Sequence, residues 1–201
     1  MAMKGAIFLD KDGTLLEDVP YNVNPAQMRF APGAANGLRR LARLELPLIV
    51  ISNQPGVALG LFEECHLHLV RKRLAQMFAS VGAPLDGFYY CMHHPLGRVP
   101  GLACQCECRK PAPGLVYRAA AEHGISLERS WFIGDILNDV EAGRRAGCET
   151  ILLNNGNETE WLPGPLRVPH HVVEDLDQAS LVVFERDAID NEALAPMKDI
   201  A

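Results

Sequence analysis

The chain has 201 residues, 48% of them hydrophobic and 22% charged, a balance that is ordinary for a globular protein with one buried core. Its formal net charge of −6 argues against a nucleic-acid partner and against binding to an anionic membrane surface. No apolar run is long enough for the core of a signal peptide or for a membrane span, so we expect a cytoplasmic protein without a membrane partner.

Short apolar runs alternate along the chain with segments of helical periodicity. Strands are predicted at residues 5–9, 48–52, 87–91, 131–134 and 150–153, and helices at residues 34–44, 63–81, 114–123 and 139–146. This alternation predicts an α/β fold of three layers, in which a mostly parallel sheet carries helices on both faces. Residues 172–173 are a candidate edge strand, and residues 176–184 a candidate last helix. We expect one domain over residues 1–184 and a loose acidic tail over residues 185–201.

Two aspartates follow the first predicted strand directly. Asp10 and Asp12 are two residues apart on an extended chain, so their side chains project to the same side. Such a pair repels itself unless a cation lies between the acids or one of them holds a proton. A divalent metal with oxygen ligands, most simply Mg²⁺, resolves this conflict. The alternative is a solvated turn after a strand.

Polar residues also end two of the other predicted strands, and a basic pair precedes one of the predicted helices. Ser52-Asn53-Gln54 ends the second strand, where side chains and backbone N–H groups suit an anion, although the same residues are ordinary turn formers. Arg109-Lys110 precedes a helix, where a lysine can hold a phosphate, or where both residues are simply solvated. Asp135 ends the fourth strand. Asp139 follows either as a helix N-cap or as a residue that supports a metal site.

A cluster of cysteines and histidines falls in the long irregular stretch between residues 91 and 108. Thiolates and an imidazole within one loop match tetrahedral Zn²⁺ ligation, and the preferred ligands are Cys91, His93, Cys106 and Cys108. Cys104 could replace Cys106, and His94 could replace His93. Four protein ligands leave no open position, so the predicted zinc is structural. The alternative is a group of free thiols that cluster by chance.

The combination Asp-x-Asp-Gly-Thr, Ser-Asn-Gln, Arg-Lys-Pro and Gly-Asp-x-x-x-Asp, each at its place in the predicted sheet, resembles the haloacid dehalogenase-like (HAD-like) phosphohydrolases. The resemblance covers about residues 4–175 and implies a Rossmannoid domain. It implies Asp10 as the nucleophile that forms an aspartyl-phosphate, and Asp12 as general acid and then general base. Ser52 and Lys110 would bind the phosphoryl group. Asp10, the Asp12 carbonyl and Asp135 would bind Mg²⁺.

The sequences Cys-x-His-His-Pro and Cys-x-Cys-Arg-Lys-Pro resemble one branch of that superfamily, which contains the D-glycero-D-manno-heptose 1,7-bisphosphate 7-phosphatases and the histidinol-phosphate phosphatases. The resemblance implies no large cap domain, a small-molecule phosphate ester as substrate and a monomeric enzyme. Leu59 and Ile136 depart from this branch, which commonly has cations at both positions. Arg109 remains to serve a second phosphate, and Asn53 is a further candidate for phosphate binding. The sugar bisphosphate is the preferred substrate; the alternatives are histidinol phosphate or another small phosphate ester, and a catalytically silent zinc-stabilised binding module.

Overall fold

A parallel sheet lies at the centre of the fold, which is described here over residues 3–194 of a computed structural model. Its strands in chain order are β1 (Ile7–Leu9), β2 (Leu48–Asn53), β3 (Gly87–Cys91), β4 (Trp131–Gly134), β5 (Glu149–Leu153) and β6 (His171–Val173). Within the described residues they are arranged in the order β3-β2-β1-β4-β5-β6, and every pair is parallel. The predicted parallel α/β fold is confirmed.

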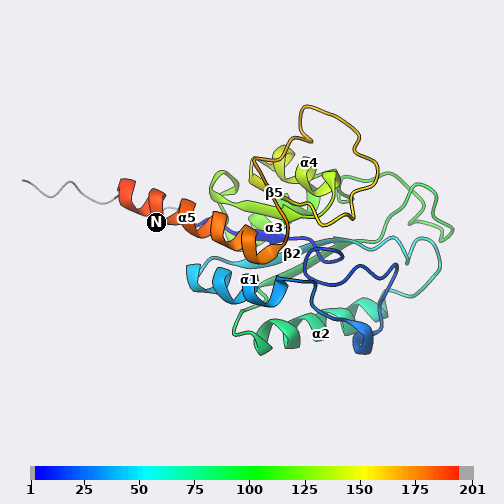
Figure 1. Cartoon of the computed structure of the whole chain (residues 1–201). Helices are drawn as coiled ribbons and strands as arrows, with labels where there is room; N and C mark the ends of the chain where they lie inside the picture. Colours follow the sequence, from blue (N-terminus) through cyan, green and yellow to red (C-terminus); the bar gives the residue numbers. More distant parts are fainter. Residues whose placement is uncertain (1–2, 195–201) are drawn as a thin grey trace, which may run out of the picture.

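Helices cover both faces of the sheet (Figure 1). One face packs against α1 (Ala34–Leu41), α2 (Cys65–Ser80) and α5 (Leu176–Leu194), and the other against α3 (Gly114–His123) and α4 (Leu137–Ala146). Three short 3₁₀ helices, η1 (Pro25–Gln27), η2 (Ala42–Leu44) and η3 (Leu127–Arg129), lie in the connections among the described residues. No helix of residues 3–194 has both the length and the hydropathy to cross a bilayer.

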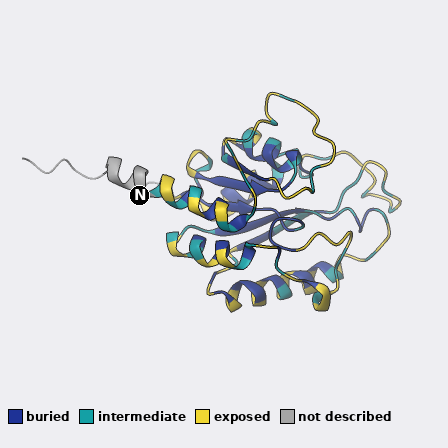
Figure 2. Cartoon of the chain, in the orientation of Figure 1, coloured by how far each residue is buried: buried dark blue, intermediate teal, exposed yellow. Residues whose placement is uncertain are grey.

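The strands divide their side chains between two apolar cores because successive residues of a strand point to opposite faces. Ile7 and Leu9 join the core under α1, α2 and α5, whereas Phe8 joins the core under α3 and α4. All three are fully buried, and Figure 2 shows the sheet as the buried layer between helices whose outer faces are exposed. Burial on both faces explains why these strands are continuous apolar runs in the sequence.

Strand order reverses beside β1, because β2 and β3 extend the sheet to one side of it and β4, β5 and β6 to the other. Open α/β sheets bind ligands at such a switch point, outside the carboxyl ends of the strands. Asp10 follows β1 and Asp135 follows β4, so both acids lie at this point. Between β1 and β2, all of residues 10–47 are described and hold only η1, α1 and η2, which leaves no inserted cap domain there.

The last helix is longer than its sequence pattern predicts. Helix α5 runs from Leu176 to Leu194, so residues 185–194, expected to begin a loose tail, continue the helix instead. Leu176, Ala179 and Val183 anchor its first half in the core beside α1. The rest of the expected tail, residues 195–201, lies outside the described residues.

Candidate active site

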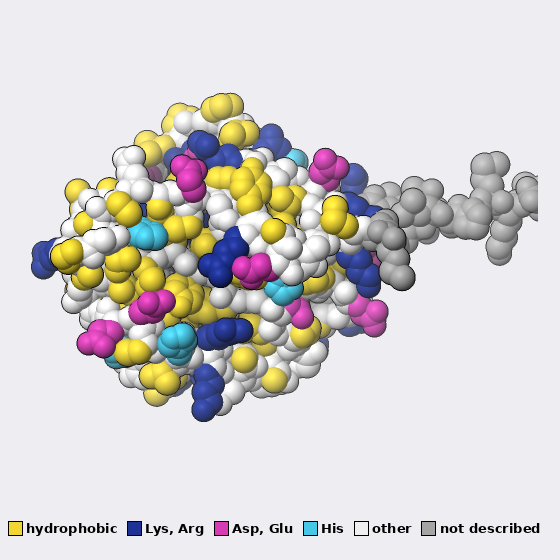
Figure 3. Space-filling model, turned by 180° about the vertical axis from the view of Figure 1, so that it is seen from behind, with side chains coloured by type: hydrophobic (Ala, Val, Ile, Leu, Met, Phe, Trp, Pro, Cys, Tyr) yellow, Lys and Arg dark blue, Asp and Glu magenta, His cyan; other side chains and the backbone are white. Residues whose placement is uncertain are grey.

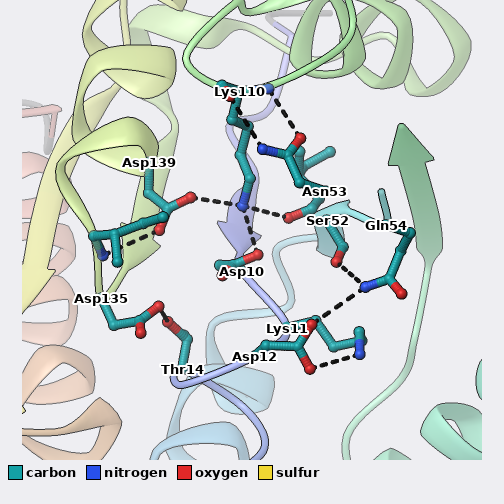
Figure 4. A network of polar contacts seen from close by, with 12 residues as sticks. Asp10, Lys11, Asp12, Thr14, Ser52, Asn53, Gln54, Lys110, Asp135 and Asp139 are labelled. Atoms are coloured by element: carbon teal, nitrogen blue, oxygen red, sulfur yellow. Dashed lines mark hydrogen bonds and ion pairs between the residues drawn. The ribbon is translucent and has the colours of Figure 1, made fainter. Parts of the chain in front are cut away.

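A small cavity of about 180 Å³ opens at the carboxyl ends of β1, β2 and β4. It is lined by Asp10, Asp12, Asp18, Asn53, Lys110, Asp135, Ile136 and Asn157. These residues come from five separate stretches of the chain, and Figure 4 shows most of the polar network around them. The structure therefore brings together the strand ends that the sequence singles out.

Lys110 is the centre of this network. Its ammonium group lies 2.5 Å from Asp10 Oδ1 and 2.6 Å from Asp139 Oδ1, and it donates to the Ile51 carbonyl at 3.1 Å. The lysine is 3% exposed, so its charge is held by these partners and not by water. Burial acts to lower the pKa of Lys110, but the two carboxylates outweigh it and raise the pKa above its ordinary value. Lys110 is thus a fixed positive charge beside Asp10.

Three buried carboxylates surround that single ammonium group. Asp10, Asp135 and Asp139 each offer an oxygen, and the three oxygens lie within 4.8 Å of one another. Burial, followed by the neighbouring acids, raises the pKa of Asp10 well above its ordinary value although Lys110 opposes the change. Burial and the charge of Asp139 raise the pKa of Asp135 to about 7. This excess of buried negative charge, made of hard oxygen ligands, fits a divalent cation such as Mg²⁺.

Asp139 acts in a way that the sequence left open. The N-cap of α4 is Ile136, and Asp139 is the third residue of the helix, so the N-cap hypothesis for Asp139 is wrong. Its carboxylate accepts the Ile136 N–H at 3.3 Å and pairs with Lys110. Asp139 therefore has two functions: it holds the lysine in place, and it accepts a backbone N–H at the start of α4.

The Asp12 carboxylate points away from the three buried acids. Lys11 Nζ lies 2.6 Å from its Oδ1, and Gln54 Nε2 donates to its Oδ2 at 3.2 Å. The cluster of possible metal-binding carboxylates accordingly contains Asp139 and not the Asp12 side chain. The Asp12 carboxylate is about a third exposed. The metal-binding role of the Asp12 carbonyl and the acid–base role of its carboxylate stay predictions.

The residues after β2 support this arrangement in different ways. The Asn53 amide exchanges two hydrogen bonds of 3.0 Å with the Lys110 backbone, a supporting role that was not predicted. Ser52 is buried, and its hydroxyl accepts a hydrogen bond from Gln54 Nε2 at 2.8 Å. Arg109 Nη1 is enclosed and has no hydrogen-bond partner among the described residues. The phosphate-binding roles of Ser52, Asn53 and Arg109 stay predictions.

Thr14 and Asn157 were not predicted as site residues, yet both donate to Asp135. Thr14 Oγ1 reaches Asp135 Oδ1 at 3.0 Å, and Asn157 Nδ2 reaches Asp135 Oδ2 at 2.8 Å. Thr14 stands in the first motif and could have been found from it. Asn157 belongs to no motif that the sequence analysis identified, and Gln54 was identified only as part of the Ser52-Asn53-Gln54 motif, without a contact to Asp12.

The four preferred zinc ligands lie together: Cys91 ends β3, and the other three lie on the loop between β3 and α3. The sulfurs of Cys91, Cys106 and Cys108 are 3.1–3.6 Å apart, and His93 Nδ1 lies 3.2 Å from Cys108 Sγ. Tetrahedral ligation with Zn–S bonds near 2.3 Å separates sulfurs by about 3.8 Å, so this donor set fits zinc. Cys104 is exposed and outside the group.

Comparisons with known proteins agree with this geometry. A family profile described as HAD-hydrolase-like matches residues 107–179. The chain is 38% identical over 156 residues to the D-glycero-beta-D-manno-heptose-1,7-bisphosphate 7-phosphatase of Pasteurella multocida, covering 77% of this chain and 84% of that protein. It is 36% identical over 166 residues to the enzyme of the same name from Escherichia coli strain K12, covering 78% and 87%.

A solved structure extends the agreement to the whole fold. D,D-heptose 1.7-bisphosphate phosphatase from B. bronchiseptica, crystallised with magnesium and phosphate, superimposes with a TM-score of 0.73 at 27% identity. The match covers 90% of this chain and 99% of that one. By its identity to these relatives and by its fold, the chain belongs to the HAD-like phosphatases, in the branch that contains the heptose 1,7-bisphosphate 7-phosphatases.

Proposed function

We propose that the protein hydrolyses the 7-phosphate of D-glycero-D-manno-heptose 1,7-bisphosphate through an aspartyl-phosphate on Asp10. The observation that carries this proposal is the Lys110 ammonium group, held 2.5 Å from Asp10 at the end of the central strand. A carboxylate attacks a phosphate ester only where cations offset the repulsion between the two anions. Lys110 is one such cation, and its charge favours the ionised, nucleophilic form of Asp10 against the opposing effect of burial.

The three buried carboxylates define where the second cation would bind. Asp10, Asp135 and the Asp12 carbonyl are its proposed ligands, and Asp139 stays paired with Lys110. Mg²⁺ held by these ligands would offset the negative charge of the phosphoryl group and would stabilise the charge that develops on its oxygens. In the first step, an Asp10 oxygen forms a bond to phosphorus as the bond to the sugar oxygen breaks.

Asp12 is placed to move the protons. It gives a proton to the leaving sugar oxygen in the first step and takes one from the attacking water in the second, which releases inorganic phosphate and restores Asp10. Lys11 and Gln54 hold its carboxylate at the cavity from two sides. Asp12→Asn should therefore accumulate phosphoenzyme, because water is no longer activated.

Arg109 is the proposed partner of the second phosphate. A guanidinium group carries five N–H donors, and Arg109 is only partly buried. A phosphate oxygen would accept from it, as a charge-assisted bond. Leu59 and Ile136 offer no charge, so this bond matters more here than it would beside other cations.

The cluster of Cys91, His93, Cys106 and Cys108 is proposed to hold one structural zinc ion. Its last two ligands lie directly before Arg109 and Lys110, so the ion would fix the segment that carries both cations. A thiolate site of this kind needs a reducing compartment, which supports a cytoplasmic enzyme. We also propose that it acts as a monomer.

The test measures phosphate release by the zinc-loaded protein with Mg²⁺ from the heptose 1,7-bisphosphate, heptose 7-phosphate and histidinol phosphate. The bisphosphate should be preferred, and ³¹P NMR should show the 1-phosphate retained. Asp10→Asn should lower turnover by several orders of magnitude, and Arg109→Ala should cost about tenfold more with the bisphosphate than with the monophosphate. Equal losses would contradict the role of Arg109. Faster release from histidinol phosphate would replace the proposed substrate, and release from none would favour a binding module.

A further inference from the structure

The loop that follows β5 reaches back into the active site through two asparagines. Asn155 Nδ2 donates to the Gly13 carbonyl at 2.7 Å, and Asn157 Nδ2 donates to Asp135 Oδ2 at 2.8 Å. Asn157 is half-buried and lines the cavity. These contacts join a loop with no motif of its own to the turn after Asp12 and to a proposed metal ligand.

The loop is anchored well enough to position a side chain. Glu158, next to Asn157, accepts the Leu137 N–H at 2.6 Å and so attaches the loop to the start of α4. The Asn157 backbone N–H donates to Asn155 Oδ1 at 3.3 Å, which couples the two asparagines. The backbone around Asn157 is therefore held on both sides of the residue, and its side-chain amide donates to Asp135 from this fixed position.

Asp135 has one donor on each carboxylate oxygen. Thr14 Oγ1 holds Oδ1 and Asn157 Nδ2 holds Oδ2, so rotation of the carboxylate would break both hydrogen bonds. Each oxygen can accept more than one bond, so capacity for a cation remains after these donors are satisfied. Side chains that orient metal ligands in this way commonly change metal affinity 10- to 100-fold when they are removed.

We propose that Asn157 is a positioning residue that sets the affinity of the active site for its divalent cation by fixing the Asp135 carboxylate. The inference rests on the metal site of the proposed function and adds to it a residue from outside the family motifs. It assigns the loop after β5 a role in metal binding through the contact of Asn157 with Asp135.

The experiment uses Mn²⁺ as the probe, because free Mn²⁺ gives an EPR signal that is lost on binding, and no substrate is needed. The zinc-loaded, full-length protein is titrated as wild type, Asn157→Ala, Asn157→Gln and Asn154→Ala, with Asp135→Asn as the variant that loses the ligand itself. Asn154 is exposed in the same loop and is the matched control. Asn157→Ala should bind Mn²⁺ roughly 10- to 100-fold more weakly than wild type. Asn157→Gln, which keeps the donor, should recover part of the loss, and Asn154→Ala should match wild type.

A purely structural role predicts a different pattern. In that case Asn157→Ala lowers the melting temperature of the metal-free protein while the Mn²⁺ affinity of the folded protein stays as in wild type, and the inference is overturned. If wild type itself binds no Mn²⁺ at this site, the metal-dependent function fails together with the inference. If wild type and Asn157→Ala bind equally well, only the inference fails.

Discussion

Lys110→Met removes the one cation that the described residues place among three buried carboxylates. Methionine fills a similar length of side chain but gives Asp10 and Asp139 no partner for their charges. Removing one partner of a buried ion pair typically costs about 3–5 kcal/mol of unfolding free energy. With both carboxylates nearly fully buried, we expect the upper part of that range at pH 8 in buffer without added Mg²⁺.

The loss should shrink as the pH falls. The pKa of Lys110 is raised, so its stabilising charge is fully present in the wild type from pH 5 to pH 8. The pKa of Asp10 is raised in the folded state above its ordinary value of 3.8. The unfolded chain therefore loses this proton first, and Asp10 lowers the stability progressively as the pH rises from 3.8 to the raised pKa of the folded state. Without the lysine that pKa rises further. At pH 5 the acids can hold protons, and the missing cation matters less.

Urea unfolding at pH 5 and pH 8, followed by tryptophan fluorescence, measures this difference. Trp131 lies buried at the start of β4, the strand whose carboxyl end leads into the site, and it reports on the sheet. The control is Lys72→Met, which removes an exposed lysine of α2 and should change stability little at either pH. A loss of the same size at both pH values, or a Lys110→Met variant as stable as Lys72→Met, would refute the reasoning.

Two further substitutions test the other parts of the site. Cys108→Ser should lose about one zinc ion per chain and should also lose activity, whereas Cys148→Ser, whose thiol is buried away from the cluster, should keep the metal. Elemental analysis of the zinc content of both variants measures this difference. Gly13→Ala places a Cβ 1.9 Å from Asp135 Oδ2 at a φ of +78°, and should lower turnover at least about tenfold because the carboxylate must move. Gly82→Ala has a similar φ of +74° with nothing within 4 Å, so it should cost about 1 kcal/mol in thermal unfolding and leave turnover intact.

One face of the molecule mixes side chains of both charges. On the face shown in Figure 3, acidic, basic and histidine side chains are interspersed with apolar ones, and no wide patch of one charge appears. The cations that matter for the proposed chemistry are instead inside: Lys110 is buried, and Arg109 has an enclosed nitrogen. A net charge of −6 therefore says little about what the active site binds.

The sequence by itself determined the order of most strands and helices, because the central strands are apolar runs buried on both faces and the helices between them have apolar residues at helical spacing. It also determined which strand ends carry chemistry. Parallel strands place their carboxyl ends at one edge of the sheet, so Asp10 after β1 and Asp135 after β4 had to approach one another whatever the loops do, whereas Lys110 is brought to them by the loop between β3 and α3. The same local logic placed four zinc ligands on one loop, although Cys104 and His94 remained as alternatives.

Only the tertiary structure decided how these groups share their partners. The Asp139 carboxylate meets Lys110, and Asn157 meets Asp135, because loops with no periodic pattern bring them there. The Asp12 carboxylate contacts Lys11 and Gln54 and lies outside the cluster of three buried carboxylates. Helix periodicity and strand alternation report which face a residue lies on, but a hydrogen bond depends on positions within a few tenths of an ångström. Those positions are set by packing between segments far apart in the chain, which no local pattern encodes.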